Sequence, residues 1–254
     1  MSYYIENTWY RVLSSQLFLI LYAILAAFLG INIKTFIIIM VLIIITSYIQ
    51  GKFLSKGPLG GSSVKAEEVM SAKRLYEEKN LREIQMKDEG LLRDMQPQFR
   101  YMMLLNLGLL VGFLYFFLVW GRIGDLHSIF YSFTGNEKIA SFLAFLIYME
   151  GFFIINQASM ILALRRVGKV LFIVYPNEYI VTVKGIVYKG LISNTAIGFP
   201  LPQNVNAILD INRGFVDLVN EGKRTTSIIR LYSRNPKRVY EIIKKHGFKT
   251  IETS

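Results

Sequence analysis

The chain lacks cysteine entirely and has only two histidines among its 254 residues. Without cysteine there is no disulfide framework, thiolate metal site, cysteine nucleophile or iron–sulfur cluster. Two isolated histidines leave little for zinc chemistry, and the sequence has no glycine-rich phosphate loop, HExxH motif or GxSxG motif. We therefore expect a protein that is not an enzyme and uses no cofactor or metal.

Apolar residues and positive charge are both in excess. Hydrophobic residues make up 53% of the chain, the mean hydropathy is +0.38, and the formal net charge is +11. This is too apolar for an ordinary water-soluble domain of this length. Both excesses are typical of a polytopic membrane protein.

Long stretches without charge predict four transmembrane helices. Residues 12–33, 35–51 and 101–121 carry no charge, and residues 139–164 are interrupted only by Glu150. About 20 residues are needed to cross the hydrocarbon core. The first two spans would form a tight hairpin through residues 30–34; the alternative is a single long bent helix.

The distribution of Lys and Arg predicts the orientation of these spans. Residues 52–100 hold ten of them and the tail from Arg165 onward holds fifteen, whereas the opposite loops hold only Lys34, Arg122 and Lys138. Positive residues concentrate on the cytoplasmic side of a membrane. We expect a multi-pass plasma-membrane protein with both termini in the cytoplasm.

Four segments follow from this division. Residues 1–51 form a transmembrane hairpin, 52–100 a cytoplasmic linker and helical arm, 101–164 the third and fourth spans, and 165–254 a cytoplasmic domain. Within the second segment, residues 57–63 have the composition of a flexible linker, and residues 64–95 are helix formers of mixed charge. The arm is either a solvated helix or a contact surface for a partner. Its candidate contact residues are Met70, Ile84, Met86, Leu91 and Met95.

Residues 165–254 read as a β-rich domain closed by a helix. Strands are expected at 169–175, 179–183, 186–188, 205–211, 215–219 and 226–232, with Lys184-Gly185 as a hairpin turn. Asn235 is the expected N-cap of the closing helix, Pro236 its first residue and Gly247 its end. Short strands capped by one amphipathic helix are the plan of a pleckstrin-homology-like (PH-like) barrel.

The run Ile229–Pro236, which leads into the closing helix, resembles the corresponding part of prokaryotic membrane-associated PH-like domains. The whole chain also resembles a family of archaeal polytopic membrane proteins, and that resemblance implies no biochemical function. Basic side chains of the tail either reflect the positive-inside bias and a solvated face, or bind anionic lipid headgroups or a partner such as the ribosome. They are Arg165, Arg166, Lys169, Lys184, Lys189, Lys237, Arg238, Lys244 and Lys245.

A second resemblance concerns the order of the membrane segments. A span, a cytoplasmic helical segment and two further spans resemble the core of the YidC/Oxa insertase superfamily, and residues 95–103 are similar to its Met-rich, Pro-containing entry. This resemblance implies nascent membrane proteins, a translocon or a ribosome as partners, besides the lipid bilayer. The fold class we expect is an α-helical bundle of four transmembrane helices with a cytoplasmic helical arm and a C-terminal PH-like domain.

Polar residues within the spans suggest a groove open to the cytoplasm. Asn106, Glu150, Asn156 and Gln157 are the candidates, because polar groups inside a membrane are costly and often functional. The alternative is ordinary hydrogen bonding between helices. The leading hypothesis is a membrane-protein insertase that uses this groove. The others are a non-enzymatic scaffold that uses the arm and the PH-like domain, and a proton-coupled transporter that uses Glu150.

Overall fold

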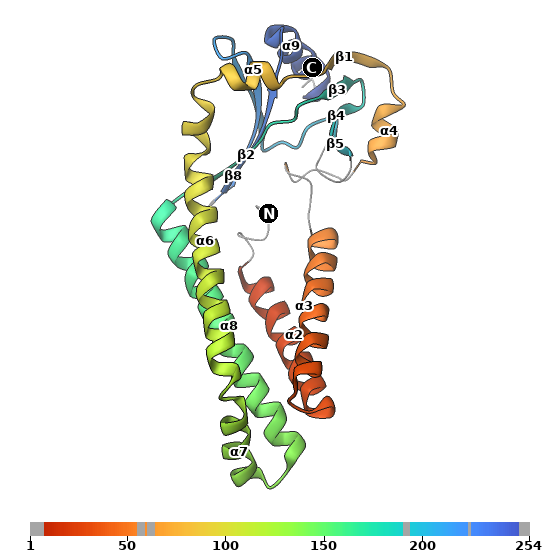
Figure 1. Cartoon of the computed structure of the whole chain (residues 1–254). Coiled ribbons are helices and arrows are strands. Elements are labelled where there is room, and N and C mark those ends of the chain that lie inside the picture. Colours follow the sequence, from red (N-terminus) through yellow and green to blue (C-terminus); the bar gives the residue numbers. More distant parts are fainter. Residues whose placement is uncertain (1–7, 55–58, 60–63, 190–193, 223–224, 249–254) are drawn as a thin grey trace. The chain divides into compact units, whose positions relative to one another are not determined.

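The structure is a computed structural model that describes residues 8–54, 59, 64–189, 194–222 and 225–248. The chain forms two compact units (Figure 1). The helical unit consists of Asn7–Leu54 and Arg100–Gly168. The described residues of the β-rich unit fall within Ser55–Phe99 and Lys169–Ser254, so the described part of each unit comes from two separate stretches of chain.

The helical unit contains α2 (Thr8–Leu29), α3 (Ile33–Leu54), most of α6 (Leu91–Trp120), α7 (Ile123–Thr134) and α8 (Glu137–Val167). Gly30 adopts a left-handed conformation at the end of α2, with φ at 78°, and the Asn32 side chain accepts a hydrogen bond from the Thr35 amide at 3.0 Å. These two features produce the turn into α3. Gly135 and Asn136 turn the chain from α7 into α8 in the same way.

Three helices are long and apolar enough to cross a membrane: α6, α8 and the Val12–Leu29 part of α2. They correspond to the first, third and fourth predicted spans. In α3 the apolar stretch is shorter and covers Ile33–Thr46. Four spans are therefore not shown, and the second remains a prediction.

The β-rich unit contains two four-stranded sheets. One has the order β1 (Arg74–Glu78), β3 (Tyr179–Thr182), β4 (Gly185–Lys189), β5 (Asn194–Gly198), and all its pairs are antiparallel. The other has the order β2 (Val170–Val174), β8 (Thr225–Tyr232), β7 (Phe215–Glu221), β6 (Val205–Asp210), with only β2 and β8 parallel. The closing helix is α9 (Pro236–Gly247).

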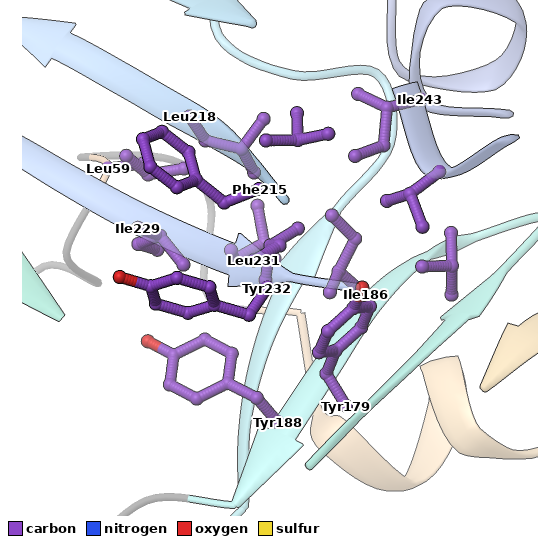
Figure 2. Close-up of a cluster of buried hydrophobic side chains, with 14 of the residues drawn as sticks. Leu59, Tyr179, Ile186, Tyr188, Phe215, Leu218, Ile229, Leu231, Tyr232 and Ile243 are labelled. Atoms are coloured by element: carbon purple, nitrogen blue, oxygen red, sulfur yellow. The ribbon is translucent and has the colours of Figure 1, made fainter. Parts of the chain in front are cut away.

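Both sheets and α9 contribute to one hydrophobic core (Figure 2). Ile186 of β4, Leu218 of β7, Ile229 of β8 and Ile243 of α9 are almost completely buried in it. Leu59, from the predicted linker, is buried in the same core, while the rest of 57–63 lies outside the described residues. The predicted β-rich region and its closing helix are confirmed, including Asn235, whose side chain accepts a hydrogen bond from the Arg238 amide.

The prediction of a helical arm over residues 64–95 is wrong. This segment contains α4 (Ala66–Met70), then β1, then α5 (Arg82–Lys87), before α6 begins at Leu91. Helix propensity is a weak preference that tertiary contacts override. Here β1 pairs with β3, and its last residue, Glu78, is buried with its carboxylate bonded to Ser233 and Arg234. Strand β5 was also not predicted.

Candidate functional site

Glu150 of the predicted membrane groove has a partner on another helix. The Gln16 side-chain amide of α2 donates to a carboxylate oxygen of Glu150 on α8 at 3.2 Å, in a half-buried position. An acidic residue at the middle of an apolar helix is costly unless it is bonded or hydrated. The pairing with Gln16 provides one such bond and joins α2 to α8.

The structure places the other three groove candidates on α6 and α8. Asn156 donates to the carbonyl of Phe152, one turn earlier on the same helix, at 2.8 Å. Asn106 is exposed on α6, and Gln157 is half-buried on α8. A hydrated groove that contains all four residues therefore stays a prediction.

Helices α6 and α8 approach closely at glycines that the sequence reasoning missed. Side chains at Gly108 and Gly112 would collide with Ser159 and Phe152 of α8. Small residues four apart are a known signal for close packing of membrane helices, and the spacing Gly108-x-x-x-Gly112 carries that signal. Further along, the hydroxyl of the buried Tyr148 donates to the Phe116 carbonyl at 2.8 Å.

The predicted basic residues fall into two groups. Lys169, Lys184 and Lys189 each lie within 3.4 Å of a glutamate, so their charges are matched locally. The basic residues of α9 and of the end of α8 form the second group, and their side chains are exposed. They are Lys237, Arg238, Lys244, Lys245, Arg165 and Arg166.

The predicted arm contacts also divide. Leu91 and Met95 are buried against Ile173 of β2, so they stabilise their own unit rather than face a separate partner. Ile84 packs partly against the core. Met86 is 72% exposed and Met70 is 37% exposed.

A cluster of acidic residues and arginines in the β-rich unit was not foreseen. It joins the start of α6 to the second sheet, and we call it the acid–arginine cluster. Asp94, in the first turn of α6, accepts hydrogen bonds from Arg213 and Arg230, both at 2.8 Å. Its members are Asp88, Asp94, Arg213, Asp217, Arg230 and Tyr232.

The cluster is held by paired contacts. Arg213 makes a two-point contact with Asp88 at 2.7 and 2.8 Å, and Arg230 makes one with Asp217 at 2.9 Å for both bonds. Such two-point pairs fix geometry as well as charge. The Arg230 guanidinium also lies 3.9 Å from the centroid of the Phe215 ring. No local sequence pattern predicts this cluster. Its ion-pair partners are more than 100 positions apart in the chain, with the exception of Asp217 and Arg230.

Two opposing effects set the pKa values of the carboxyl groups in the cluster: burial raises them, and hydrogen bonds from the arginines lower them. Burial alone would raise the pKa of Asp88, but hydrogen bonds from Arg213 and Tyr232 outweigh it, so the pKa is lowered. The pKa of Asp94 is lowered in the same way by Arg230 and Arg213. For the more deeply buried Asp217, burial dominates despite Arg230, and the pKa is raised.

An open cleft of about 660 Å³ lies beside this cluster, between the α5–α6 junction and the β6–β7 turn. Its lining includes Ile84, Lys87, Arg93, Ile211 and the paired Arg213. Gly90 also lines it, and a side chain there would occupy the position of the Arg213 guanidinium. The cleft therefore has a rigid ionic wall and an apolar edge. Within the part of the chain that the structure describes, no group of His, Asp and Glu side chains could hold a metal ion.

Helices of this length and composition, joined to a β-rich unit, define an integral membrane protein. A family model described as "Predicted membrane protein (DUF2208)" matches residues 10–246, and the chain belongs to this family. No curated protein and no solved structure matches the chain.

Proposed function

We propose that the protein is a membrane-anchored, non-enzymatic scaffold whose β-rich unit binds a partner protein in the cleft. The observation that carries this proposal is the position of the cleft beside the first turn of α6. The same helix continues into an apolar stretch able to cross a membrane. A partner bound there would be attached directly to a membrane-spanning helix.

The lining of the cleft suits a segment that carries both acidic and apolar side chains. Lys87 and Arg93 are exposed in the lining, together with one exposed acidic residue, Glu89, so positive charge exceeds negative charge among the exposed lining residues. Ile84 and Ile211 offer apolar area beside them, and Ile211 is 53% exposed. Arginine and apolar side chains together are typical of the centre of a protein interface.

Photo-crosslinking in native membranes tests this proposal. We would place a photoreactive phenylalanine analogue at Asn212, which lines the cleft, and, as the control, at the exposed Glu241 of α9. A discrete adduct from position 212 and none from position 241 is expected, with the adduct weakened by Arg93→Glu. No adduct at position 212, or equal adducts at both positions, would reject the cleft as the binding site.

Binding to anionic lipid headgroups is another form of the same scaffold function, and the PH-like resemblance favours it. The exposed residues Lys237, Arg238, Lys244 and Lys245 of α9 support this form, because basic side chains near a membrane are attracted to anionic lipids. Salt-dependent binding of the purified full chain to phosphatidylserine vesicles, absent with phosphatidylcholine vesicles, would favour it. The vesicle assay separates this form from a protein partner in the cleft.

An insertase is the second candidate, and the Gln16–Glu150 pair within the helices is the observation that favours it. A polar pair of this kind would lower the cost of bringing a polar flank of a client into the bilayer. The incorporation of β1 into a sheet removes the free helical arm that the insertase resemblance implied. Insertion of a single-span client into proteoliposomes that contain the full chain tests this candidate.

Glu150→Gln would distinguish an insertase from a proton-coupled transporter. An insertase should tolerate the change, since an amide keeps the polarity of the site. A transporter should lose proton coupling. Because the chain has no cysteine, single cysteines at Asn106, Glu150 and Gln157 would also report whether these positions are hydrated.

A further inference from the structure

The second sheet has two edge strands, β2 and β6, and they differ in how the described residues protect them. At β2, the Ile173 amide donates to the side-chain oxygen of Gln98 at 3.0 Å, and the start of α6 packs against Ile173. Strand β6 contains no lysine, arginine or proline, and its one charge is Asp210 at the end. Such residues, or a covering element, usually protect an exposed edge, because its free backbone groups can pair with another strand. Strand β6 therefore has the features of an edge that is open for pairing.

The backbone pairing of the sheet leaves two residues of β6 with unused hydrogen-bonding groups. The Gly222 amide donates to the Thr225 carbonyl where β7 ends, so the even-numbered residues of β7 bond to β8 and the odd-numbered ones to β6. In the register of β6 with β7, this directs the backbone groups of Ala207 and Leu209 away from β7. Among the described residues, no hydrogen bond reaches the amides or carbonyls of these two residues.

The side chains on the outward face of β6 form a short row of different chemistry. Asn206 is exposed, Ile208 is 54% exposed, and Asp210 is half-buried. A carboxylate oxygen of Asp210 accepts a hydrogen bond from the Arg213 amide at 3.0 Å, which fixes the side chain at the end of the row. The row therefore has an apolar centre, with an amide on one side and a carboxylate on the other.

We propose that β6 pairs with β6 of a second copy of the chain, antiparallel and centred on Ile208. In this register, Ala207 of each copy exchanges both hydrogen bonds with Leu209 of the other, which satisfies the free groups of both edges. Ile208 then lies opposite Ile208 of the second copy. Asn206 lies opposite Asp210, so the amide of one copy meets the carboxylate of the other.

The strand itself indicates both this occupant and this register. A surface that binds its own copy about a two-fold axis must be self-complementary, and the row of amide, apolar side chain and carboxylate has this property. A register centred on Ala207 would instead place Leu209 opposite Val205, whose amide already donates to the Pro202 carbonyl at 3.0 Å. The long apolar helices hold both copies in one membrane, which raises their effective concentration for a small strand-to-strand contact. This inference does not rest on the cleft or on the function proposed for it.

Disulfide crosslinking of the full chain in native membranes tests the pairing, because the chain has no cysteine of its own. Opposite residues that share no backbone hydrogen bonds have Cα atoms about 4.5 Å apart, which a disulfide can bridge. Ile208→Cys should therefore give a disulfide-linked dimer on oxidation. Ile211→Cys is the matched control, since Ile211 is 53% exposed but lies beyond the end of β6, and it should stay monomeric.

Further variants test the register and the role of the backbone. Asn206→Cys and Asp210→Cys, on chains with different tags, should crosslink to each other and neither to itself. In the Ile208→Cys chain, Ala207→Pro removes an outward-facing amide and should abolish the dimer, whereas Ala207→Val keeps that amide and should retain it. Proline is tolerated on an edge strand where the N–H faces away from the sheet.

Several results would overturn the proposal. Absence of a dimer from Ile208→Cys would reject the pairing, and equal dimers from Ile208→Cys and Ile211→Cys would indicate random collisions. A dimer from Asn206→Cys alone would contradict the register. An Ile208→Cys dimer that persists with Ala207→Pro would show that the strands do not pair through their backbones. A crosslink from position 208 to a different protein would assign the edge to another partner.

Discussion

Among the described residues, the β-rich unit buries charged side chains that act in networks, whereas the buried polar side chains of the helical unit are neutral. Glu78, Asp88, Asp217 and Arg230 are all buried in the first unit. In the helical unit the buried Tyr148 bonds to one backbone carbonyl. The difference matches the surroundings, because a charge that is costly inside a protein is costlier still inside a lipid bilayer.

The charged contacts of the β-rich unit also join its two separate stretches of chain. Asp88 and Asp94 come from the first stretch and Arg213 and Arg230 from the second. Glu78 and Arg234 form a similar joint at 2.7 Å. The helical unit, also made from two stretches, is joined by apolar packing and by the hydrogen bond between Gln16 and Glu150. This difference predicts that replacing a buried polar side chain lowers stability far more in the β-rich unit than in the helical unit.

The largest expected effect comes from separating the two stretches of the β-rich unit. Residues 165–254 expressed alone lack β1, Glu78, Asp88 and Asp94, so β3 loses a paired edge and Arg230 loses one of its partners. We expect this fragment not to fold. A matched protein that carries residues 55–99 joined by a flexible linker to 169–254 should fold. Chemical-shift dispersion in NMR spectra reports both outcomes, and a well-dispersed spectrum from the short fragment would contradict the discontinuous unit.

Arg230→Leu is expected to be the most damaging single substitution. It leaves the buried Asp217 without its two-point partner, and breaking one partner of a buried ion pair costs about 3–5 kcal/mol. Amide hydrogen exchange of β7 and β8 in the detergent-solubilised full chain measures the loss. Asp217→Leu with Arg230→Leu is the matched control, and it should recover much of the stability because no unpaired charge remains. A double variant as unstable as the single one would mean that packing, not charge, dominates.

Acidification should weaken the β-rich unit through Asp88 and Asp94. Their pKa values are lowered in the folded chain, so their contribution to stability is complete above the ordinary value of 3.8 and is lost as the pH falls through the lowered values. Asp217 acts in the opposite direction, because its pKa is raised and its protonation relieves an unfavourable buried charge. We expect a net loss of exchange protection below about pH 4. Asp94→Asn should flatten this dependence, and an unchanged slope would show that Asp94 does not control it.

Sequence reasoning identified the parts whose signals are local. Three long apolar helices, six of the strands and the Asn235 cap each depend on residues close together in the chain. It failed where a distant partner decides the structure. Strand β1 has the composition of a helix, and it is a strand because β3 lies beside it and Glu78 meets Ser233 and Arg234.

The same distinction between local signals and distant partners explains which candidate sites could be predicted from the sequence. Glu150 stood out because charge inside an apolar run is a local anomaly, and the structure gives it a partner in Gln16. The sequence contains no local signal for the acid–arginine cluster. Asp94 and Arg230 are residue types that are usual at protein surfaces, and they are 136 positions apart. The missed Gly108-x-x-x-Gly112 spacing, in contrast, was present in the sequence and readable.

Tyr148→Phe gives the smallest expected effect and the sharpest test of the comparison. It removes one hydrogen bond to the Phe116 carbonyl and leaves the ring in place, and single hydrogen bonds between membrane helices average about 0.6 kcal/mol. Trp120 lies 5.7 Å from the Tyr148 ring, centroid to centroid, so its fluorescence during unfolding in detergent mixtures reports this junction once Trp9 is replaced by Phe in both proteins. Tyr115→Phe, which removes a 3.1 Å bond to the Tyr148 carbonyl, is the matched control and should cost a similar amount. A loss from Tyr148→Phe as large as that from Arg230→Leu would mean that neutral bonds in the helical unit carry as much stability as the ionic cluster, and the contrast between the two units would not hold.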